Sequence, residues 1–234
     1  MSEWKQKRFW KQVTVAEAGS SFAVELDGRR VKTPAKAPLA VPTRAMAEAI
    51  AAEWNAQGES VDPHAMPCTR SANAAIDKVT HQHGEVAAML AEYGDTDLLC
   101  YRAAAPEELA RRQAAEWDPA LDWAEAALGA RLLPREGVLH AAQDPAALET
   151  LGGKVHALAP FQLAAFHDLV GISGSLVLGF AAAEGWRSAD EIWQLSRLDE
   201  RWQEEQWGVD EEAAAAAAVK RREFLHAERF FRLS

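Results

Sequence analysis

Cysteine is scarce in this sequence. Cys68 and Cys100 are its two cysteines in 234 residues, and no C-x-x-C pair occurs. Nothing therefore indicates a disulfide framework or a cysteine-based metal site. We expect a chain of this kind in a reducing compartment.

Long apolar runs and excess positive charge are also missing. The most apolar stretch, residues 169–183, is shorter than the roughly 20 residues that span a bilayer. The first residues lack the apolar segment of a secretion signal. The formal net charge is −10, whereas nucleic-acid binding requires clustered Lys and Arg. We expect neither membrane insertion nor a nucleic-acid partner.

The sequence shows no recognisable phosphate or metal motif. Gly152-Gly153-Lys154 is followed by valine and has no second glycine at the P-loop spacing. His81 and His83 lie two apart on an expected helix, which turns them to different faces, and no H-E-x-x-H occurs. We therefore expect no metal and no cofactor.

Catalytic constellations are equally weak. His167 and Asp168 are a possible base and carboxylate, but neighbours on a helix are not expected to face each other. No G-x-S-x-G surrounds a serine. Asp95 and Asp97 are better explained as capping or turn residues than as cation ligands. We expect no catalytic residues.

The first 42 residues have the β-branched and aromatic content of strands. Asp27-Gly28 predicts a tight hairpin turn, because glycine accepts the positive φ that such a turn requires. Residues 1–36 are also basic, with eight Lys and Arg against four acids. The expected strands are Phe9–Val15, Phe22–Leu26, Arg29–Thr33 and Leu39–Val41.

From Thr43 onward, apolar residues recur at helical spacing. Residues 94–101 are ambiguous, with an extended loop or short strand favoured, and residues 132–143 are irregular. The expected helices are Ala45–Gln57, one capped by Thr69 that carries Ala72, Ile76 and Val79, Glu85–Tyr93, Pro106–Trp117, Pro119–Leu128, Pro145–Leu158, Phe161–Ala183, and a last helix from Glu211 with Ala217, Phe224 and Phe231 on its buried stripe.

Strands followed by helices predict an α+β fold. We expect a strand-rich α+β domain at residues 1–68 and a helical domain at residues 69–234. Within the apolar helix expected at residues 161–183, Gly171, Ser175 and Gly179 lie four apart. Small residues at that spacing predict that a neighbouring helix approaches closely.

Acidic residues concentrate near the end of the chain. Residues 188–212 contain nine Asp and Glu against Arg197 and Arg201. Apolar residues within this stretch recur at steps of three and four, which predicts one helix with a single apolar stripe. We expect Gly208 to end that helix in a left-handed cap and Asp210 to cap the next one. The stripe residues are Ile192, Leu195, Leu198 and Trp202.

This acidic corner has two possible meanings. It is a solvated face with ordinary capping residues, or it is a surface for a basic partner. The density of charge beside Trp207 favours the partner, because tryptophan is frequent at the centre of protein interfaces.

The order of several short segments resembles the assembly-chaperone family that binds the alpha subunit of the ATP synthase catalytic head. The resemblance runs from Arg8 to about the end of the chain. Each segment is weak alone, but their order and spacing together are specific. The segments are Arg8-Phe9-Trp10-Lys11, Leu26-Asp27-Gly28-Arg29, Lys32-Thr33-Pro34, Glu53-Trp54, Met66-Pro67, Tyr93, Thr96-Asp97-Leu98, Gln113, Trp117-Asp118-Pro119, Leu198-Asp199-Glu200, Trp202-Gln203, Trp207-Gly208 and Asp210-Glu211-Glu212.

The resemblance implies a non-catalytic chaperone. Such a protein holds the free alpha subunit, shields the surface that later meets the beta subunit, and releases it during hexamer assembly. The implied architecture is a small N-terminal α+β portion followed by an orthogonal helical bundle. Family members in mitochondria need a presequence, which this sequence does not show, so we expect a bacterial cytoplasmic protein that acts as a monomer.

The resemblance places a binding role on the acidic corner. We expect its acids to meet basic residues of the alpha subunit and its tryptophan to provide an apolar anchor. The basic hairpin Arg29, Arg30 and Lys32 is a second candidate surface. Two alternatives remain: an enzyme of unknown type with a site in a cleft between domains, and a scaffold for another partner. The acidic candidates are Glu204, Glu205, Trp207, Asp210, Glu211 and Glu212.

Overall fold

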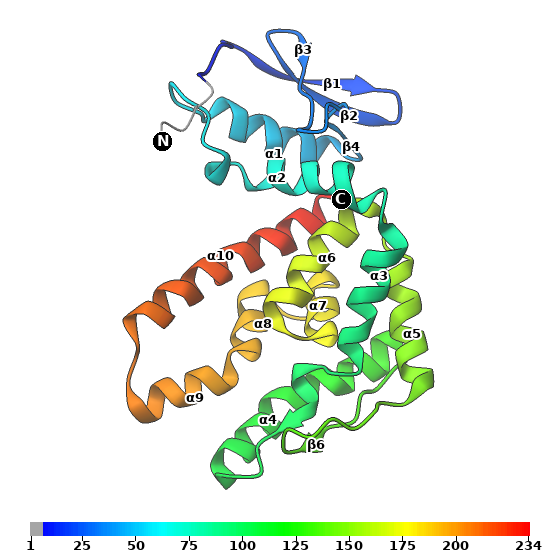
Figure 1. Cartoon of the computed structure of the whole chain (residues 1–234), viewed down its shortest axis with the longest axis vertical. Coiled ribbons are helices and arrows are strands. Elements are labelled where there is room, and N and C mark those ends of the chain that lie inside the picture. Colours follow the sequence, from blue (N-terminus) through cyan, green and yellow to red (C-terminus); the bar gives the residue numbers. More distant parts are fainter. Residues whose placement is uncertain (1–6) are drawn as a thin grey trace. The chain divides into compact units, whose positions relative to one another are not determined.

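The computed structural model describes residues 7–234, and its α+β class agrees with the sequence prediction. Antiparallel strands lie near the N-terminus, and ten α-helices follow them in this part of the chain (Figure 1). Residues 1–6 of the predicted first domain lie outside the described residues. No helix within residues 7–234 combines the length and the hydropathy that a bilayer crossing needs.

The chain divides into two compact units. The first contains residues up to Gln82 together with 159–165 and 229–234, and the second contains residues 83–158 and 166–228. Two helices, α6 (Pro160–Ser173) and α10 (Glu211–Arg232), therefore contribute residues to both units. The domain division predicted at residues 68 and 69 remains a prediction.

A small sheet forms the first part of unit 1. Strands β1 (Val13–Ala18) and β2 (Ser21–Leu26) are antiparallel, and β3 (Arg29–Arg30) and β4 (Ala40–Val41) both pair with β2. The predicted hairpin turn is present, with φ of 49° at Asp27 and 77° at Gly28. The Asp27 carboxylate accepts hydrogen bonds from the backbone N–H groups of Gln12 and Lys11, which lower its pKa.

Two of the predicted strands are too long. The first begins at Val13 rather than Phe9, and the strand expected at Arg29–Thr33 ends at Arg30. A turn follows, in which Lys36 donates its N–H to the carbonyl of Thr33 at 2.9 Å and has φ of 73°. Proline at position 34 has no N–H for a ladder, which limits the pairing.

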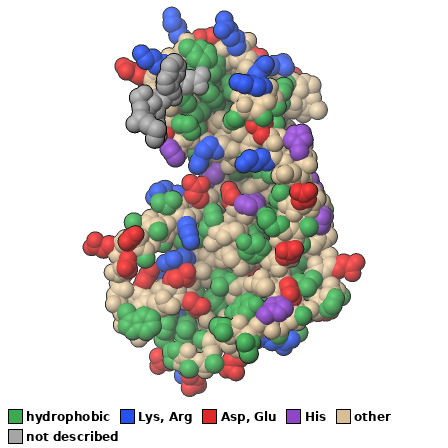
Figure 2. Space-filling view, viewed as in Figure 1, with side chains coloured by type: hydrophobic (Ala, Val, Ile, Leu, Met, Phe, Trp, Pro, Cys, Tyr) green, Lys and Arg blue, Asp and Glu red, His purple; other side chains and the backbone are tan. Residues whose placement is uncertain are grey.

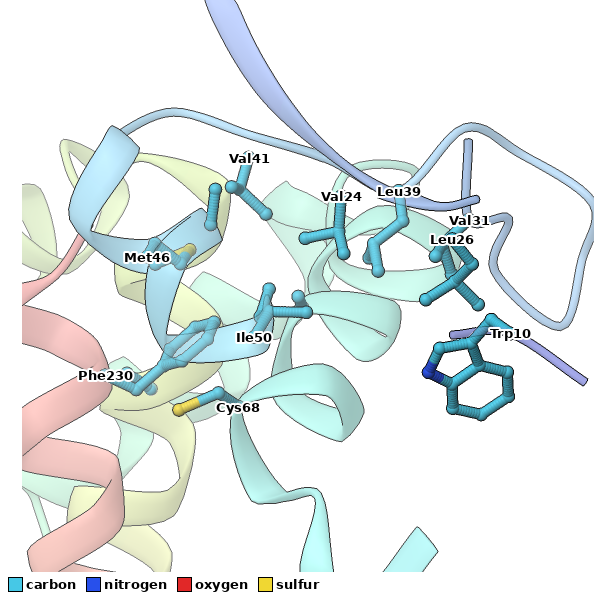
Figure 3. Packing of buried hydrophobic residues seen from close by; sticks show 13 residues of the cluster. Trp10, Val24, Leu26, Val31, Leu39, Val41, Met46, Ile50, Cys68 and Phe230 are labelled. Atoms are coloured by element: carbon cyan, nitrogen blue, oxygen red, sulfur yellow. The ribbon is translucent and has the colours of Figure 1, made fainter. Parts of the chain in front are cut away.

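Helices α1 (Arg44–Asn55) and α2 (Pro67–Ala74) complete unit 1. Their apolar side chains and those of the strands form one core, to which Phe230 near the C-terminus also contributes (Figure 3). The Glu53 carboxylate on α1 accepts hydrogen bonds from the N–H groups of Cys68 and Thr69 and from the Thr69 hydroxyl, at 2.6 to 2.8 Å. Thr69 lies inside α2 rather than at its start, so the prediction that it caps the helix is wrong. The Glu53 carboxylate accepts from the free N–H groups at the start of α2 in its place.

The second unit is built from helices and two short paired strands. Strands β5 (Tyr101–Arg102) and β6 (Arg135–Glu136) are parallel, so the ambiguous segment before residue 102 ends in a short strand. The helices are α3 (His83–Ala91), α4 (Glu107–Trp123), α5 (Pro145–His156), most of α6, α7 (Leu176–Ala183), α8 (Ala189–Ser196), α9 (Leu198–Trp207) and most of α10.

Helix α4 passes through Pro119, although two helices were predicted on either side of it. Proline lacks the N–H of the helical ladder, so an interruption is the local expectation. Burial on both sides of the proline outweighs that cost: Trp117 and Leu121 are fully buried. The Trp117 indole N–H donates to the Leu195 carbonyl at 2.9 Å, which fixes α4 to α8.

The long apolar helix predicted at residues 161–183 is two helices. Gly174 has φ of 71°, and the Ser175 hydroxyl caps α7 by accepting from the N–H of Leu178 at 3.0 Å. The predicted close approach occurs at Gly179, where a Cβ would lie 2.7 Å from Val170 Cγ2 on α6. At Gly171 a Cβ would meet no atom within 4 Å, so that part of the prediction is wrong.

The buried stripe of helix α10 agrees with the prediction at Phe224 but not at Ala217 and Phe231. Phe224, Ala227 and Phe230 are buried, whereas Ala217 and Phe231 are only partly buried. The alanine-rich first half of the helix is mostly exposed. Helix propensity explains why this half is helical, but it does not require that the half be covered.

Candidate partner-binding site

The acidic corner is formed by two helices rather than the single one predicted. Helix α8 ends at Ser196 and α9 begins at Leu198, with Arg197 between them. Three of the predicted stripe residues are buried, while Trp202 is only partly so. The bend at Arg197 lets the apolar residues of both helices reach the core, and it leaves the acidic side chains of α9 outside.

Trp207 at the end of α9 is the largest apolar side chain that the corner exposes. It is 79% exposed, and Val209 is 65% exposed. Gly208 between them has φ of 90° and ψ of 166°. This is a positive φ, but not the left-handed helical cap that was predicted, so the chain continues extended. Asp210 then caps α10 as predicted, with its carboxylate accepting the N–H of Ala213 at 2.8 Å.

The acids of the corner differ in what surrounds them. Glu204 forms an ion pair with Arg197 at 2.9 Å, and Glu205 forms one with Arg112 at 2.6 Å. The hydrogen bond from Arg112 lowers the pKa of Glu205. Glu211 and Glu212 lie exposed in the first turn of α10, where the helix dipole favours negative charge. Glu211 and Glu212 are therefore better placed than Glu204 and Glu205 to meet a basic partner.

An apolar groove of about 400 Å³ lies beside Trp207, and we name it the corner groove. Gln113 organises its wall: the side chain accepts the N–H of Ala103 at 2.7 Å and donates to the Asp199 carboxylate at 2.7 Å. These two bonds tie the loop before α4 to α9. The lining residues are Tyr101, Arg102, Ala103, Ala104, Ala105, Pro106, Leu109, Gln113, Gly137, Val138, Asp199, Trp202, Gln203 and Trp207.

An apolar loop that was not predicted from the sequence lies at the edge of this groove. Val138 and Leu139 are 88% and 83% exposed. Asp95 anchors the loop, with one carboxylate oxygen 2.8 Å from the His140 ring and the other accepting the N–H of Gln143 at 2.8 Å. The sequence does show two apolar residues next to Gly137. Because this segment has no helical or strand periodicity, the sequence does not indicate whether their side chains are buried or exposed.

The basic hairpin lies in unit 1. Arg29, Arg30 and Lys32 are exposed. The Nε of Arg30 lies 3.6 Å from a carboxylate oxygen of Glu25. All three line a second groove of about 680 Å³, which we name the sheet groove. Figure 2 shows Lys and Arg side chains over the strands of unit 1, and Asp and Glu side chains where α9 and the start of α10 lie. The charge segregation expected from the sequence is therefore visible on each unit.

Other candidate groups have structural roles. Asp97 caps the short turn Leu98–Cys100 through the N–H of Leu99 at 3.0 Å, and it also accepts the N–H of Val177 at 3.1 Å. Burial raises its pKa to about 6, although those N–H bonds act in the opposite direction. Within residues 7–234, no group of three or more His, Cys, Asp or Glu is arranged to hold a metal ion.

The expectation that His167 and Asp168 cannot face each other is wrong. The His167 Nδ1 lies 3.0 Å from a carboxylate oxygen of Asp168, and this hydrogen bond raises the pKa of the histidine. Both side chains are about half exposed, at 52% and 42%. Long side chains at adjacent helical positions can therefore meet outside the helix surface.

The fold and its motifs can be compared with known proteins. A family model for the ATP12 chaperone protein matches residues 7–125. The chain belongs to the ATP12 chaperone family. This confirms the family predicted from the short segments of the sequence.

Solved structures and a curated relative extend the match over nearly the whole chain. Atp12 from Paracoccus denitrificans is 51% identical, with a TM-score of 0.96 over 99% of each chain. A protein of Agrobacterium tumefaciens is 42% identical, with a TM-score of 0.93 over 97% of this chain and 85% of the other. Mitochondrial atp12 of Schizosaccharomyces pombe is 27% identical over 88% of this chain and 75% of its own length. ATP12 chaperones therefore occur in both bacteria and mitochondria.

Proposed function

We propose that this ATP12 family member is an assembly chaperone of ATP synthase that binds the free alpha subunit. In this proposal it shields the beta-facing surface of the subunit until the hexamer forms. It acts as a monomer in a bacterial cytoplasm, without a cofactor. An unassembled subunit exposes an apolar interface that promotes aggregation. A protein that binds this interface reversibly is sufficient to protect the subunit.

One observation carries the proposal of a docking face: Trp207 is 79% exposed beside an apolar groove and a cluster of acids. Exposed tryptophan next to a partly apolar pocket is typical of the energetic centre of an interface. The surrounding acids supply the charged rim, which sets the association rate and the choice of partner.

Within this face, the structure supports different contributions from the predicted residues. Trp207 and the corner groove provide the apolar contact. Glu211 and Glu212 provide charge for basic residues of the alpha subunit. Asp210 holds the start of α10 in place. Glu204 and Glu205 contribute less net charge because each has an arginine neighbour.

The test is charge reversal at the start of α10. The double variant Glu211→Lys with Glu212→Lys is compared with wild type for capture of purified alpha subunit at low and high salt. We expect roughly tenfold weaker capture at low salt and a flatter salt dependence, because rim charges act mainly through screened long-range attraction.

The control carries the same change of charge elsewhere. Glu149 and Glu184 are exposed residues of unit 2 that do not line the corner groove. Their reversal to lysine should leave capture within about twofold of wild type, since isolated surface charges contribute little. Equal capture by both double variants, with both folded, would remove the start of α10 from the binding face.

A further inference from the structure

The sheet groove is an open groove of unit 1 that the core does not fill. Its volume is about 680 Å³, and it opens between the segment after β3, helix α1 and helix α2. All of its lining residues belong to unit 1. They are Phe9, Leu26, Arg29, Arg30, Val31, Lys32, Thr33, Pro34, Lys36, Trp54, Val61, Pro63, Met66, Thr69, Arg70 and Asn73.

The lining combines apolar and basic side chains. Leu26, Val31 and Met66 are buried apolar residues, while Phe9 is 60% exposed. Five lining residues are Arg or Lys and none is Asp or Glu. An occupant that matches this lining carries apolar groups together with negative charge.

The basic side of the groove is already ordered. The turn from Thr33 to Ala37 is closed by two backbone hydrogen bonds of 2.9 Å, and the N–H of Ala35 donates to the Asp77 carboxylate at 3.1 Å. These bonds connect the turn that carries Lys36 to the helical segment after α2. A rim that is fixed before binding loses less conformational entropy when a partner arrives.

A polypeptide segment offers this combination of apolar groups and negative charge, because its side chains include carboxylates as well as large apolar groups. We propose that the sheet groove binds a segment of the client subunit in which Asp or Glu lies beside large apolar residues.

This inference rests on the proposed chaperone function and adds a second contact to it. The acidic corner would meet basic residues of the client, whereas the sheet groove would meet an acidic and apolar segment. The two surfaces lie on different units and carry opposite charge, so one client must offer both kinds of sequence.

The test uses the full chain and overlapping synthetic peptides that cover the alpha subunit. The variant Arg29→Glu with Lys32→Glu reverses two cations of the groove. The control, Lys11→Glu with Lys78→Glu, makes the same change of charge at exposed residues of unit 1 outside the groove. We expect peptides that combine acids with large apolar residues to bind wild type and the control alike, and to bind the groove variant about tenfold more weakly.

Each remaining outcome decides a different question. Equal binding by the groove variant, or binding of peptides without acids, would overturn the inference. Displacement of the peptides by laurate at equal concentration would assign the groove to a small anionic amphiphile and would also overturn it. If wild type captures the intact alpha subunit but binds none of its peptides, the groove inference fails and the proposed function stands. If wild type does not capture the intact subunit, the proposed function itself fails.

Discussion

Trp207 shows how a single backbone angle exposes a side chain. Helix α9 ends there, and the positive φ of Gly208 turns the chain away before Asp210 starts α10. A residue with a Cβ at position 208 would be strained at that φ. The exposure of the tryptophan is therefore built into the link between two capped helices.

Asp97 is a buried carboxyl whose protonation is linked to folding. Its pKa rises from 3.8 to about 6 because the carboxyl is fully buried, and the N–H groups of Val177 and Leu99 offset only part of that effect. Folding therefore favours the protonated form. The resulting stability is fully present below pH 4 and is lost as the pH rises through 6.

We predict that Asp97→Asn removes this pH dependence. The whole shift corresponds to about 3 kcal/mol, of which wild type should gain about 2 kcal/mol in unfolding free energy relative to the variant between pH 7 and pH 4, because pH 4 is still close to the unfolded pKa. Urea unfolding of both proteins at the two pH values measures the difference, and titration of the other carboxyls cancels. A difference that stays constant with pH would show that Asp97 remains ionised in the fold.

At the scale of elements, the contact between α6 and α7 is controlled by one glycine. A Cβ at Gly179 would lie 2.7 Å from Val170 Cγ2 and 3.3 Å from Phe166 Cε2. Val170 and Phe166 are themselves fully buried, so they have little freedom to move.

Two alanine substitutions should therefore have opposite effects. Gly179→Ala is expected to destabilise the protein by about 1 to 3 kcal/mol through overpacking. Gly171→Ala, in α6, meets no atom within 4 Å and should stabilise by about 0.5 to 1 kcal/mol through helix propensity. Thermal unfolding of the two variants checks this. A stable Gly179→Ala protein would mean that α7 can move away from α6 at low cost.

The same elements show what the sequence could predict. Periodicity and caps correctly indicated the Asp27-Gly28 hairpin, α1, α5 and the Asp210 cap, because each depends on residues close together in sequence. The breaks at Gly174 and Arg197 and the continuity through Pro119 were predicted wrongly. The continuity through Pro119 depends on burial against distant residues, such as the contact of Trp117 with Leu195. The break at Gly174 had a local signal, a glycine followed by the Ser175 cap, which the long apolar run outweighed in the prediction.

Site residues were predictable to a similar extent. Charge density and a lone tryptophan located the acidic corner from the sequence. The ion pair of Glu205 with Arg112 joins α9 to α4, which lie far apart in the chain, so the sequence could not show it. The exposed pair Val138 and Leu139 also depends on how Asp95 anchors its loop.

For the whole molecule, the decisive question is whether both charged surfaces meet the same client. The acidic corner belongs to unit 2, and the sheet groove belongs to unit 1. Two contacts with one client convert the second into an intramolecular event, so each adds to the overall affinity. If the sheet groove bound a different protein, its reversal would leave alpha capture unchanged, both in wild type and in the acidic-corner variant.

We predict that the losses combine when both surfaces are reversed in one chain. The quadruple variant, with Glu211 and Glu212 changed to Lys and Arg29 and Lys32 changed to Glu, keeps the net charge of wild type. Its loss of capture should equal about the product of the two double-variant losses, because distant sites add in free energy. Titration of labelled alpha subunit measures the four dissociation constants, those of wild type, the two double variants and the quadruple variant. A quadruple variant that binds as well as the acidic-corner variant alone would show that the sheet groove has another client.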